Sequence, residues 1–134
     1  MSLEITESSR EGVTILDLKG RLTMSESPGV RDKISAETAA GRLNVILDLS
    51  SVDYIDSTGL GGLVISFTAL KKAGGALKLV NLNKRNVELL LLTKLHTIFE
   101  VFADLQDAVN SFFPDRQVKH FDILAFVQQN TKEE

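Results

Sequence analysis

One stretch of the sequence organises the rest of the chain: Val45-Ile46-Leu47-Asp48-Leu49-Ser50-Ser51-Val52-Asp53-Tyr54-Ile55-Asp56-Ser57-Thr58-Gly59-Leu60-Gly61-Gly62. Residues 45–49 form a short, almost entirely apolar run without alternation, which is typical of a parallel strand buried on both faces. The polar turn that follows presents a hydroxyl beside a carboxylate where a helix-like pattern begins. The stretch therefore predicts a buried strand, an exposed loop and a helix N-terminus.

The helix expected after the loop runs from Thr58 to about Lys72, because its apolar residues recur at spacings of three and four. These residues form a narrow face that we expect to pack on the sheet: Leu60, Leu63, Val64, Phe67 and Leu70. At about 100° per residue, the far side carries small or apolar residues without a charge: Gly62, Ile65, Ser66 and Ala69. Such a patch beside the loop could accept another protein.

The residues before the central stretch predict a hairpin and one helix. Residues 3–6 and 13–19 are strand candidates, and the turn-prone residues 9–12 separate them. Ser27 could cap a helix that has Pro28 at its first position, ends near Ala40 and stops at Gly41. Its apolar face is thin, so we expect this helix at the rim of the core.

After the central helix, strands and helices alternate. Residues 76–81 and 98–102 are strand candidates, Asn83 can cap a helix that reaches Leu92, and Asp104 can cap a helix over residues 105–112. Of the four leucines at 89–92, we expect one to be exposed. Residues 116–129 could form one more amphipathic helix, and residues 130–134 should fray. This order predicts an α/β fold with a mostly parallel sheet.

Composition excludes several classes of protein. The chain has 134 residues, which suits one domain, and its net charge of -3 from 15 basic and 18 acidic residues includes no basic stripe, so nucleic acid is not an expected partner. There is no cysteine, and the two histidines are well separated, which disfavours disulfides and a metal site. No signal peptide and no membrane span are recognisable, so we expect a cytoplasmic protein.

No pattern of catalytic residues is found, so we expect a protein that is not an enzyme and needs no cofactor. The nucleophile elbow G-x-S-x-G is absent around Ser57, and the glycines at 59, 61 and 62 lack the lysine of a phosphate-binding loop. His96 and His120 are each expected to be a lone surface histidine, although their spatial proximity to Ser57 stays open. We expect Asp48 to face a loop or bind backbone at the strand end.

Ser57 is better interpreted as a substrate than as a catalyst. A hydroxyl on a loop at a helix start is accessible to a kinase, and a phosphate there adds a charge of about -1.5 to -2 that the helix dipole tolerates. Binding of a partner would suffer, because the phosphate must be desolvated and Asp56 and Asp53 add repulsion. The alternative, that Ser57 is simply the N-cap of the next helix, is compatible with both roles.

Four segments resemble a known family: residues 45–49, Ile55-Asp56-Ser57-Thr58-Gly59-Leu60-Gly61, Gly74-Gly75-Ala76-Leu77-Lys78-Leu79, and Leu95-His96-Thr97-Ile98-Phe99. They are similar to the anti-sigma factor antagonists built on the STAS domain. The match runs from about residue 3 to Phe113, so we expect a STAS domain over residues 1–113 and a C-terminal extension over 114–134. The resemblance implies a mixed sheet of four to five strands, covered mainly on one face by about four helices, and the extension allows one more helix.

The resemblance also implies a partner-switching role. In this family the unphosphorylated antagonist binds an anti-sigma factor that is a serine kinase, and so releases a sigma factor; phosphorylation of the serine after the aspartate, here Ser57, switches binding off, and a PP2C-type phosphatase reverses it. Together with the uncharged helix patch, it predicts a partner-binding set: Asp56, Ser57, Thr58, Gly59, Gly62, Ile65, Ser66 and Ala69. We expect a monomer or a weak homodimer.

Three residues depart from the family pattern. Arg21 and Thr23 stand where many members have acidic residues, so we expect a different partner surface there, and Lys94 stands where a glycine is frequent. Two other functions remain open. The chain could be a STAS subunit that docks constitutively on a transporter or a signalling scaffold, or an enzyme that uses the glycine-rich turn.

Overall fold

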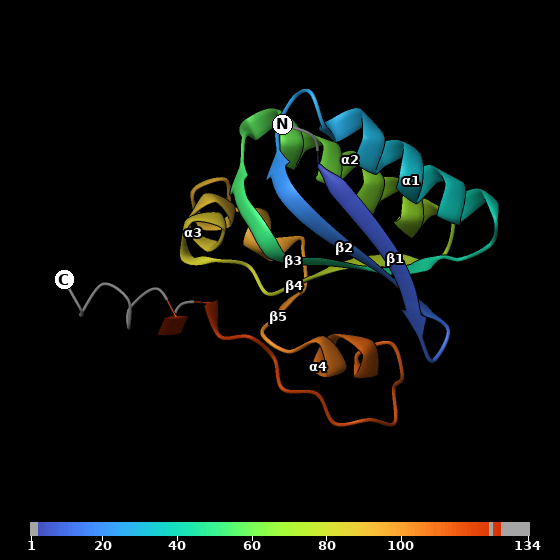
Figure 1. Cartoon of the computed structure of the whole chain (residues 1–134). Coiled ribbons are helices and arrows are strands. Elements are labelled where there is room, and N and C mark those ends of the chain that lie inside the picture. Colours follow the sequence, from blue (N-terminus) through green and yellow to red (C-terminus); the bar gives the residue numbers. More distant parts are fainter. Residues whose placement is uncertain (1–2, 124, 127–134) are drawn as a thin grey trace.

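The sheet contains five strands in the order β1-β2-β3-β4-β5 (Figure 1). The computed structural model describes residues 3–123, 125 and 126. β1 pairs antiparallel with β2, and all later neighbours pair in parallel, so the sheet is mixed. The strands are β1 (Glu4–Arg10), β2 (Val13–Leu22), β3 (Asn44–Ile55), β4 (Ala76–Val80) and β5 (Val101–Phe102). This arrangement confirms the predicted fold class.

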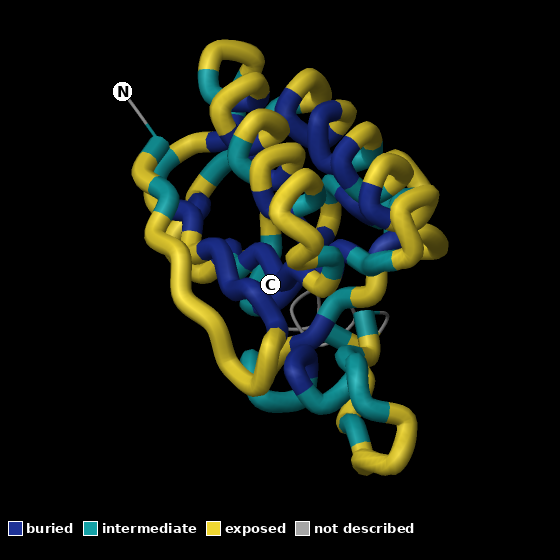
Figure 2. The backbone as a smooth tube through the Cα atoms, turned by 90° about the vertical axis from the view of Figure 1, so that its right-hand side faces the viewer, coloured by how far each residue is buried: buried dark blue, intermediate teal, exposed yellow. Residues whose placement is uncertain are grey.

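Three helices form a first layer on one face of the sheet (Figure 1): α1 (Ser27–Ala39), α2 (Ser57–Lys72) and α3 (Lys84–Leu92). Their inner side chains pack against alternate residues of the central strands, as expected when strand side chains point to opposite faces in turn. This main core is rich in fully buried leucines, among them Leu16, Leu18, Leu47, Leu49, Leu63, Leu70 and Leu90. Figure 2 shows the buried segments in the interior and the exposed ones along the outer turns of the helices.

A second, smaller layer lies on the opposite face, where α4 (Leu105–Asn110) packs (Figure 1). The residues that share this second core are Val13, Ile15, Ile46, Val80, Phe102, Ala108 and Val109. In β3, Val45 and Leu47 belong to the first core, whereas Ile46 between them belongs to the second core and is completely buried. This confirms that the strand is covered on both faces. Among the elements that the structure describes, α1, α2 and α3 are therefore on one face and α4 is on the other.

β3 is longer than predicted. It continues from the apolar run through residues 50–55, because these residues pair with the end of β2, where the register shifts on either side of Lys19 and Gly20. The exposed loop before α2 is consequently reduced to Asp56. Asp48 thus lies inside the strand and not at its end, and its Oδ1 accepts hydrogen bonds from the Ser50 backbone N–H (3.1 Å) and the Asn81 side chain (3.3 Å).

The helix starts divide into correct and incorrect predictions. Asn83 and Asp104 cap α3 and α4, since their side chains accept from the backbone N–H groups three residues later, at 2.8 Å and 3.1 Å. The prediction that Ser27 caps α1 is wrong: Glu26 is the N-cap residue, without a side-chain cap bond, and Ser27 is buried. The Ser27 side chain instead faces Gly62 of α2.

The C-terminal part differs most from expectation. Lys94 adopts a left-handed conformation (φ 61°) and begins a 3-10 turn over Leu95–Thr97, so the strand predicted over residues 98–102 is only the two-residue β5. Leu92 is 84% exposed, as predicted for one of the four leucines. Residues 117–122 are not helical, which overturns the predicted helix there; residues 123, 125 and 126 are helical, and the remaining residues of that prediction lie outside the described part.

Contacts to the second layer explain why the extension is not a helix at residues 117–122. Arg116 donates two hydrogen bonds to the Glu11 carboxylate in the β1–β2 turn (3.0 and 2.6 Å), and Val118 packs on the second core. The centroid of the His120 ring lies 5.8 Å from that of the Phe102 ring. These anchors hold the segment stretched along the layer, where a helix would not reach all of them.

Candidate functional site

Asp56 joins β3 to α2 and fixes the start of the helix. Its Oδ1 accepts a hydrogen bond from the Gly59 backbone N–H (2.7 Å), which makes Asp56 the N-cap of α2. Its Oδ2 accepts from the Met24 backbone N–H (3.2 Å), so the same carboxylate also holds the loop between β2 and α1. The carboxylate is therefore already used in positioning two loops.

Ser57 and Thr58 are the first two residues of α2, and both are exposed. Because Asp56 provides the cap, the alternative interpretation of Ser57 as the N-cap is wrong. The Ser57 hydroxyl makes no hydrogen bond within the part of the chain that the structure describes. The Ser57 hydroxyl is thus exposed and makes no hydrogen bond to the described residues, and it lies at a helix N-terminus, which favours negative charge.

Two glycines of α2 serve close packing. A Cβ on Gly59 would overlap the carbonyl oxygen of Leu22 at the end of β2, and a Cβ on Gly62 would overlap the Ser27 hydroxyl of α1. Gly61, between them, has open space around its Cα. The glycine-rich turn is therefore explained by close contacts with β2 and α1, which is a poor basis for a phosphate-binding loop.

Burial corrects part of the predicted partner-binding set. Gly59, Gly62 and Ser66 are buried within the chain, with Ser66 only 4% exposed, so they offer little surface to a partner in this conformation. The reason is that α1 packs alongside α2 and covers the flank that carries Gly62, while the end of β2 covers Gly59. Asp56 is half-buried, and the exposed members of the set are Ser57, Thr58, Ile65 and Ala69.

The predicted sheet-facing side of α2 packs on the main core, and two of its residues lie at the edge. Leu60, Leu63 and Leu70 are buried as predicted, whereas Val64 and Phe67 are half-buried. The Phe67 ring meets the Phe99 ring edge-to-face, with the centroids 5.3 Å apart. All five residues of the predicted face therefore pack in or against the main core.

A hollow of about 420 Å³ lies beside Thr58, between the N-terminal ends of α1 and α2. Its lining includes Met24 and Ile65, which are 67% and 52% exposed, and Gly61. Pro28 and Arg31 of α1 also line it, and sequence reasoning missed both of these and Met24. The only sequence signal for this hollow is Met24, an apolar residue in a polar loop, and such residues are too common to indicate a binding surface.

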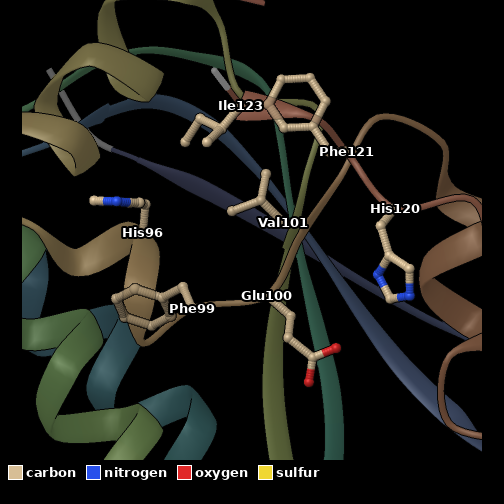
Figure 3. A pocket seen from close by; sticks show the side chains of 7 residues that line it. All are labelled: His96, Phe99, Glu100, Val101, His120, Phe121 and Ile123. Carbon is tan, nitrogen blue, oxygen red and sulfur yellow. The ribbon is translucent and has the colours of Figure 1, made fainter. Parts of the chain in front are cut away.

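The two histidines line a different pocket, of about 230 Å³, formed around the 3-10 turn, β5 and the extension (Figure 3). They lie on either side of Val101, His96 from the 3-10 turn and His120 from the extension (Figure 3). His96 is half-buried and His120 is exposed. This pocket is separate from the hollow beside Thr58, as its lining residues are all different.

Among the residues that the structure describes, no group of three or more His, Cys, Asp or Glu side chains is arranged to hold a metal ion. Within the same residues, no helix combines the length and the apolar character that crossing a membrane requires.

Comparison with known proteins supports a specific family. The model of the STAS domain matches residues 4–108 of the chain. The anti-sigma-B factor antagonist of Bacillus subtilis is 31% identical over 109 residues, which are 81% of this chain and 99% of that protein.

Solved structures agree with this match. An anti-sigma factor antagonist from Mycobacterium paratuberculosis superposes with a TM-score of 0.73 at 25% identity, over 81% of this chain and 92% of that one. The murine anion transporter Slc26a9 matches with a TM-score of 0.66 at 25% identity, over 76% of this chain but only 18% of the transporter. The extent of the family match and of the relative's coverage shows that the chain belongs to the family of STAS-domain anti-sigma factor antagonists.

Proposed function

We propose that this protein is a phosphorylation-controlled anti-sigma factor antagonist that acts in the cytoplasm. The unphosphorylated form binds an anti-sigma factor that is also a serine kinase, and a sigma factor is released. The kinase phosphorylates Ser57, which switches binding off, and a PP2C-type phosphatase restores it. The observation that carries this proposal is an exposed Ser57 hydroxyl, free of internal hydrogen bonds among the described residues, at the first position of α2.

The fold should tolerate a phosphate on Ser57. Asp56 already caps the helix, so phosphorylation removes no hydrogen bond from the folded state. The free N–H groups of the first helical turn and the positive end of the helix dipole favour an added anion. Phosphorylation is therefore expected to act on binding while the protein stays folded.

Binding should not tolerate the phosphate. The exposed apolar side chains of Met24 and Ile65 beside the hollow form a surface that a partner would cover. A doubly charged group next to such a contact must lose its water, and the neighbouring Asp56 carboxylate repels it. Ser57, Thr58, Ile65 and Ala69 are the members of the predicted set that such a surface retains.

The test uses the cognate kinase with ATP, followed by mass spectrometry of the phosphorylated peptide. We expect the phosphate on Ser57, and none after Ser57→Ala substitution, which should still bind the kinase. Ser57→Asp should weaken binding in calorimetry by at least about tenfold, or 1.4 kcal/mol. The matched control is Ser35→Asp, at an exposed serine of α1 that belongs neither to the predicted partner-binding set nor to the lining of the hollow, and it should leave binding unchanged.

Two results would contradict this proposal: phosphate on another residue, or equal affinity of the Ser57→Asp and unmodified proteins. A circular dichroism spectrum and an unfolding midpoint unchanged by Ser57→Asp would show that any loss of binding is not a loss of fold.

The similarity to part of Slc26a9 favours a second candidate function, a STAS subunit that docks constitutively on a membrane transporter. The two functions differ in the role of Ser57, because a constitutive subunit would bind equally well with serine or aspartate there. Neighbouring genes also separate them: kinase and phosphatase genes favour the switch, and transporter genes favour the subunit.

A further inference from the structure

Two arginine side chains stack on one aromatic ring near the end of β3. The guanidinium carbon of Arg21 lies 4.6 Å from the centroid of the Tyr54 ring, and that of Arg85 lies 4.4 Å from the same centroid. Both arginines are exposed, and Tyr54 is half-buried. Arg21 and Arg85 are called the arginine pair below.

The arginine pair is held by regular structure. Arg21 on β2 is the register partner of Tyr54 on β3. Arg85 is the second residue of α3, and the start of this helix is tied to β3, because the buried Asn86 side chain donates a hydrogen bond to the Val52 carbonyl oxygen (3.0 Å). Two strands and a capped helix therefore bring together three residues that are far apart in the sequence.

The arginine pair has no internal counter-charge. Within the described part of the chain, no carboxylate lies at ion-pair distance from Arg21 or Arg85. The nearest acidic residue along α3, Glu88, is paired with Lys84 at 4.0 Å. Two like charges are thus kept on one ring, where cation–π attraction offsets part of their repulsion.

Stacking on the ring leaves the guanidinium N–H groups of the arginine pair able to donate hydrogen bonds to a ligand. A guanidinium that lies over a ring keeps its N–H groups at the edge free for bidentate bonds to a carboxylate. Both distances are measured to the centroid of the Tyr54 ring. The two guanidinium carbons therefore cannot be further apart than the sum of these two distances. Carboxylates on alternate residues of an extended segment are about 6.6 Å apart, which lies within this upper limit.

We propose that the arginine pair is a binding site for an acidic segment of a protein partner. Two separate guanidinium forks suit two carboxylates better than one phosphate group, which would need both forks to converge on a single point. The site lies at the same end of the sheet as Ser57, because Tyr54 precedes it by one short connection and the Asp56 N–H binds the Leu22 carbonyl next to Arg21. A partner that covers Ser57 would therefore reach the arginine pair. The site goes beyond the proposed switch and does not depend on it.

The test uses the full chain and a hexaglutamate peptide as the probe, with hexaglutamine as the uncharged comparison. Titrations are followed by NMR of the arginine Nε–Hε groups and the Tyr54 ring. We expect the largest shifts at Arg21, Arg85 and Tyr54, and weaker binding at higher salt. Arg21→Gln/Arg85→Gln should weaken binding by about tenfold, as expected for the loss of two charge-assisted contacts.

A matched variant removes the same charge elsewhere: Lys71→Gln/Lys72→Gln changes the last turn of α2, at the opposite end of the helix from Ser57. It should weaken binding less than about twofold, through net charge alone. Tyr54→Leu keeps both arginines but removes the ring that positions them, and should weaken binding several-fold while a circular dichroism spectrum stays unchanged.

Three outcomes would overturn the proposal. The two double variants could lose affinity equally, which would show that only net charge attracts the peptide. The shifts could be spread over other basic residues. Inorganic phosphate could shift the same arginine signals at lower concentration than the peptide, which would assign the site to a phosphate group. None of these results would bear on phosphorylation of Ser57, which has its own assay.

Discussion

The two layers that cover the sheet are held in different ways. In the first layer, α2 approaches β2 and α1 so closely that Gly59 and Gly62 have no room for a Cβ. In the second layer, the short α4 is attached by a few large side chains, with Phe102 completely buried at the centre. The first layer should therefore be most sensitive to added atoms, and the second to removed ones.

The two layers also differ in whether their polar groups are bonded within the chain. In the second layer, the buried Lys78 ammonium donates a hydrogen bond to the Ser111 hydroxyl (2.8 Å), and Arg116 is paired with Glu11. At the Ser57 end of the first layer, a hydroxyl and the arginine pair have no such partner among the described residues. Polar groups bonded within the chain stabilise the fold, and those left free are available to another molecule.

The largest expected effect is a removal in the second layer. Phe102→Ala should lower the free energy of unfolding by about 3–5 kcal/mol, because it opens a cavity between the sheet and α4. Urea unfolding followed by circular dichroism measures the change. Phe67→Ala, at a half-buried position in the first layer, is the control and should cost less. A loss below about 1 kcal/mol for Phe102→Ala would mean that the second layer contributes little to stability.

An addition to the first layer should have the next largest effect. Gly59→Ala should lower the free energy of unfolding by about 1–3 kcal/mol, since the new methyl group meets a backbone carbonyl that cannot move aside easily. The control, Gly61→Ala, adds the same group to open space in the same helix and should stabilise by up to about 1 kcal/mol. Equal effects of the two substitutions in thermal unfolding would contradict the close-packing explanation.

The smallest expected effect is a difference between the two faces of the sheet in how a carboxyl group changes the free energy of unfolding with pH. Hydrogen bonds from Arg42 lower the pKa of Glu37 on α1, whereas burial, and then repulsion from Asp48, raise the pKa of Asp17 on β2. A lowered carboxyl pKa contributes stability that is present above the ordinary value of 4.5 and is lost as pH falls through the folded-state pKa. A raised one has the opposite sign, so ionised Asp17 opposes folding above its ordinary value of 3.8.

Two substitutions measure this difference. Glu37→Gln should lower the free energy of unfolding at pH 7 by about 1–2 kcal/mol and should matter less as the pH approaches 3. Asp17→Asn should raise stability slightly at pH 7 and have no effect at low pH. Urea unfolding at pH 3, 5 and 7 gives both profiles, and profiles of the same sign would contradict the assignment.

Local patterns were sufficient for much of the fold. The apolar run at residues 45–49 indicated a strand buried on both faces, and it is the centre of the parallel part of the sheet. Asn83 and Asp104 were recognisable as caps because a cap depends only on backbone groups three residues away. The local pattern indicated exposed hydroxyls at a helix start, where Ser57 and Thr58 lie, and the family resemblance selected Ser57 from the two.

The remaining features depend on residues that are distant in the sequence. Helical periodicity distinguishes the faces of α2 but does not reveal that α1 covers one of them, so Gly62 and Ser66 were placed on the surface although they are buried. The length of β3, the stretched course of residues 117–122 and the stacking of Arg21 and Arg85 on Tyr54 have the same origin.

The sequence by itself determined most of the elements and the caps of α3 and α4, because these follow from interactions within one or two turns of the chain. Only the tertiary structure decided which side of α2 is open, where the hollow lies and whether Arg21 and Arg85 have a carboxylate partner among the described residues. The physical reason is that burial and charge pairing depend on how separate elements pack against each other, and the local pattern of one element does not contain its neighbours.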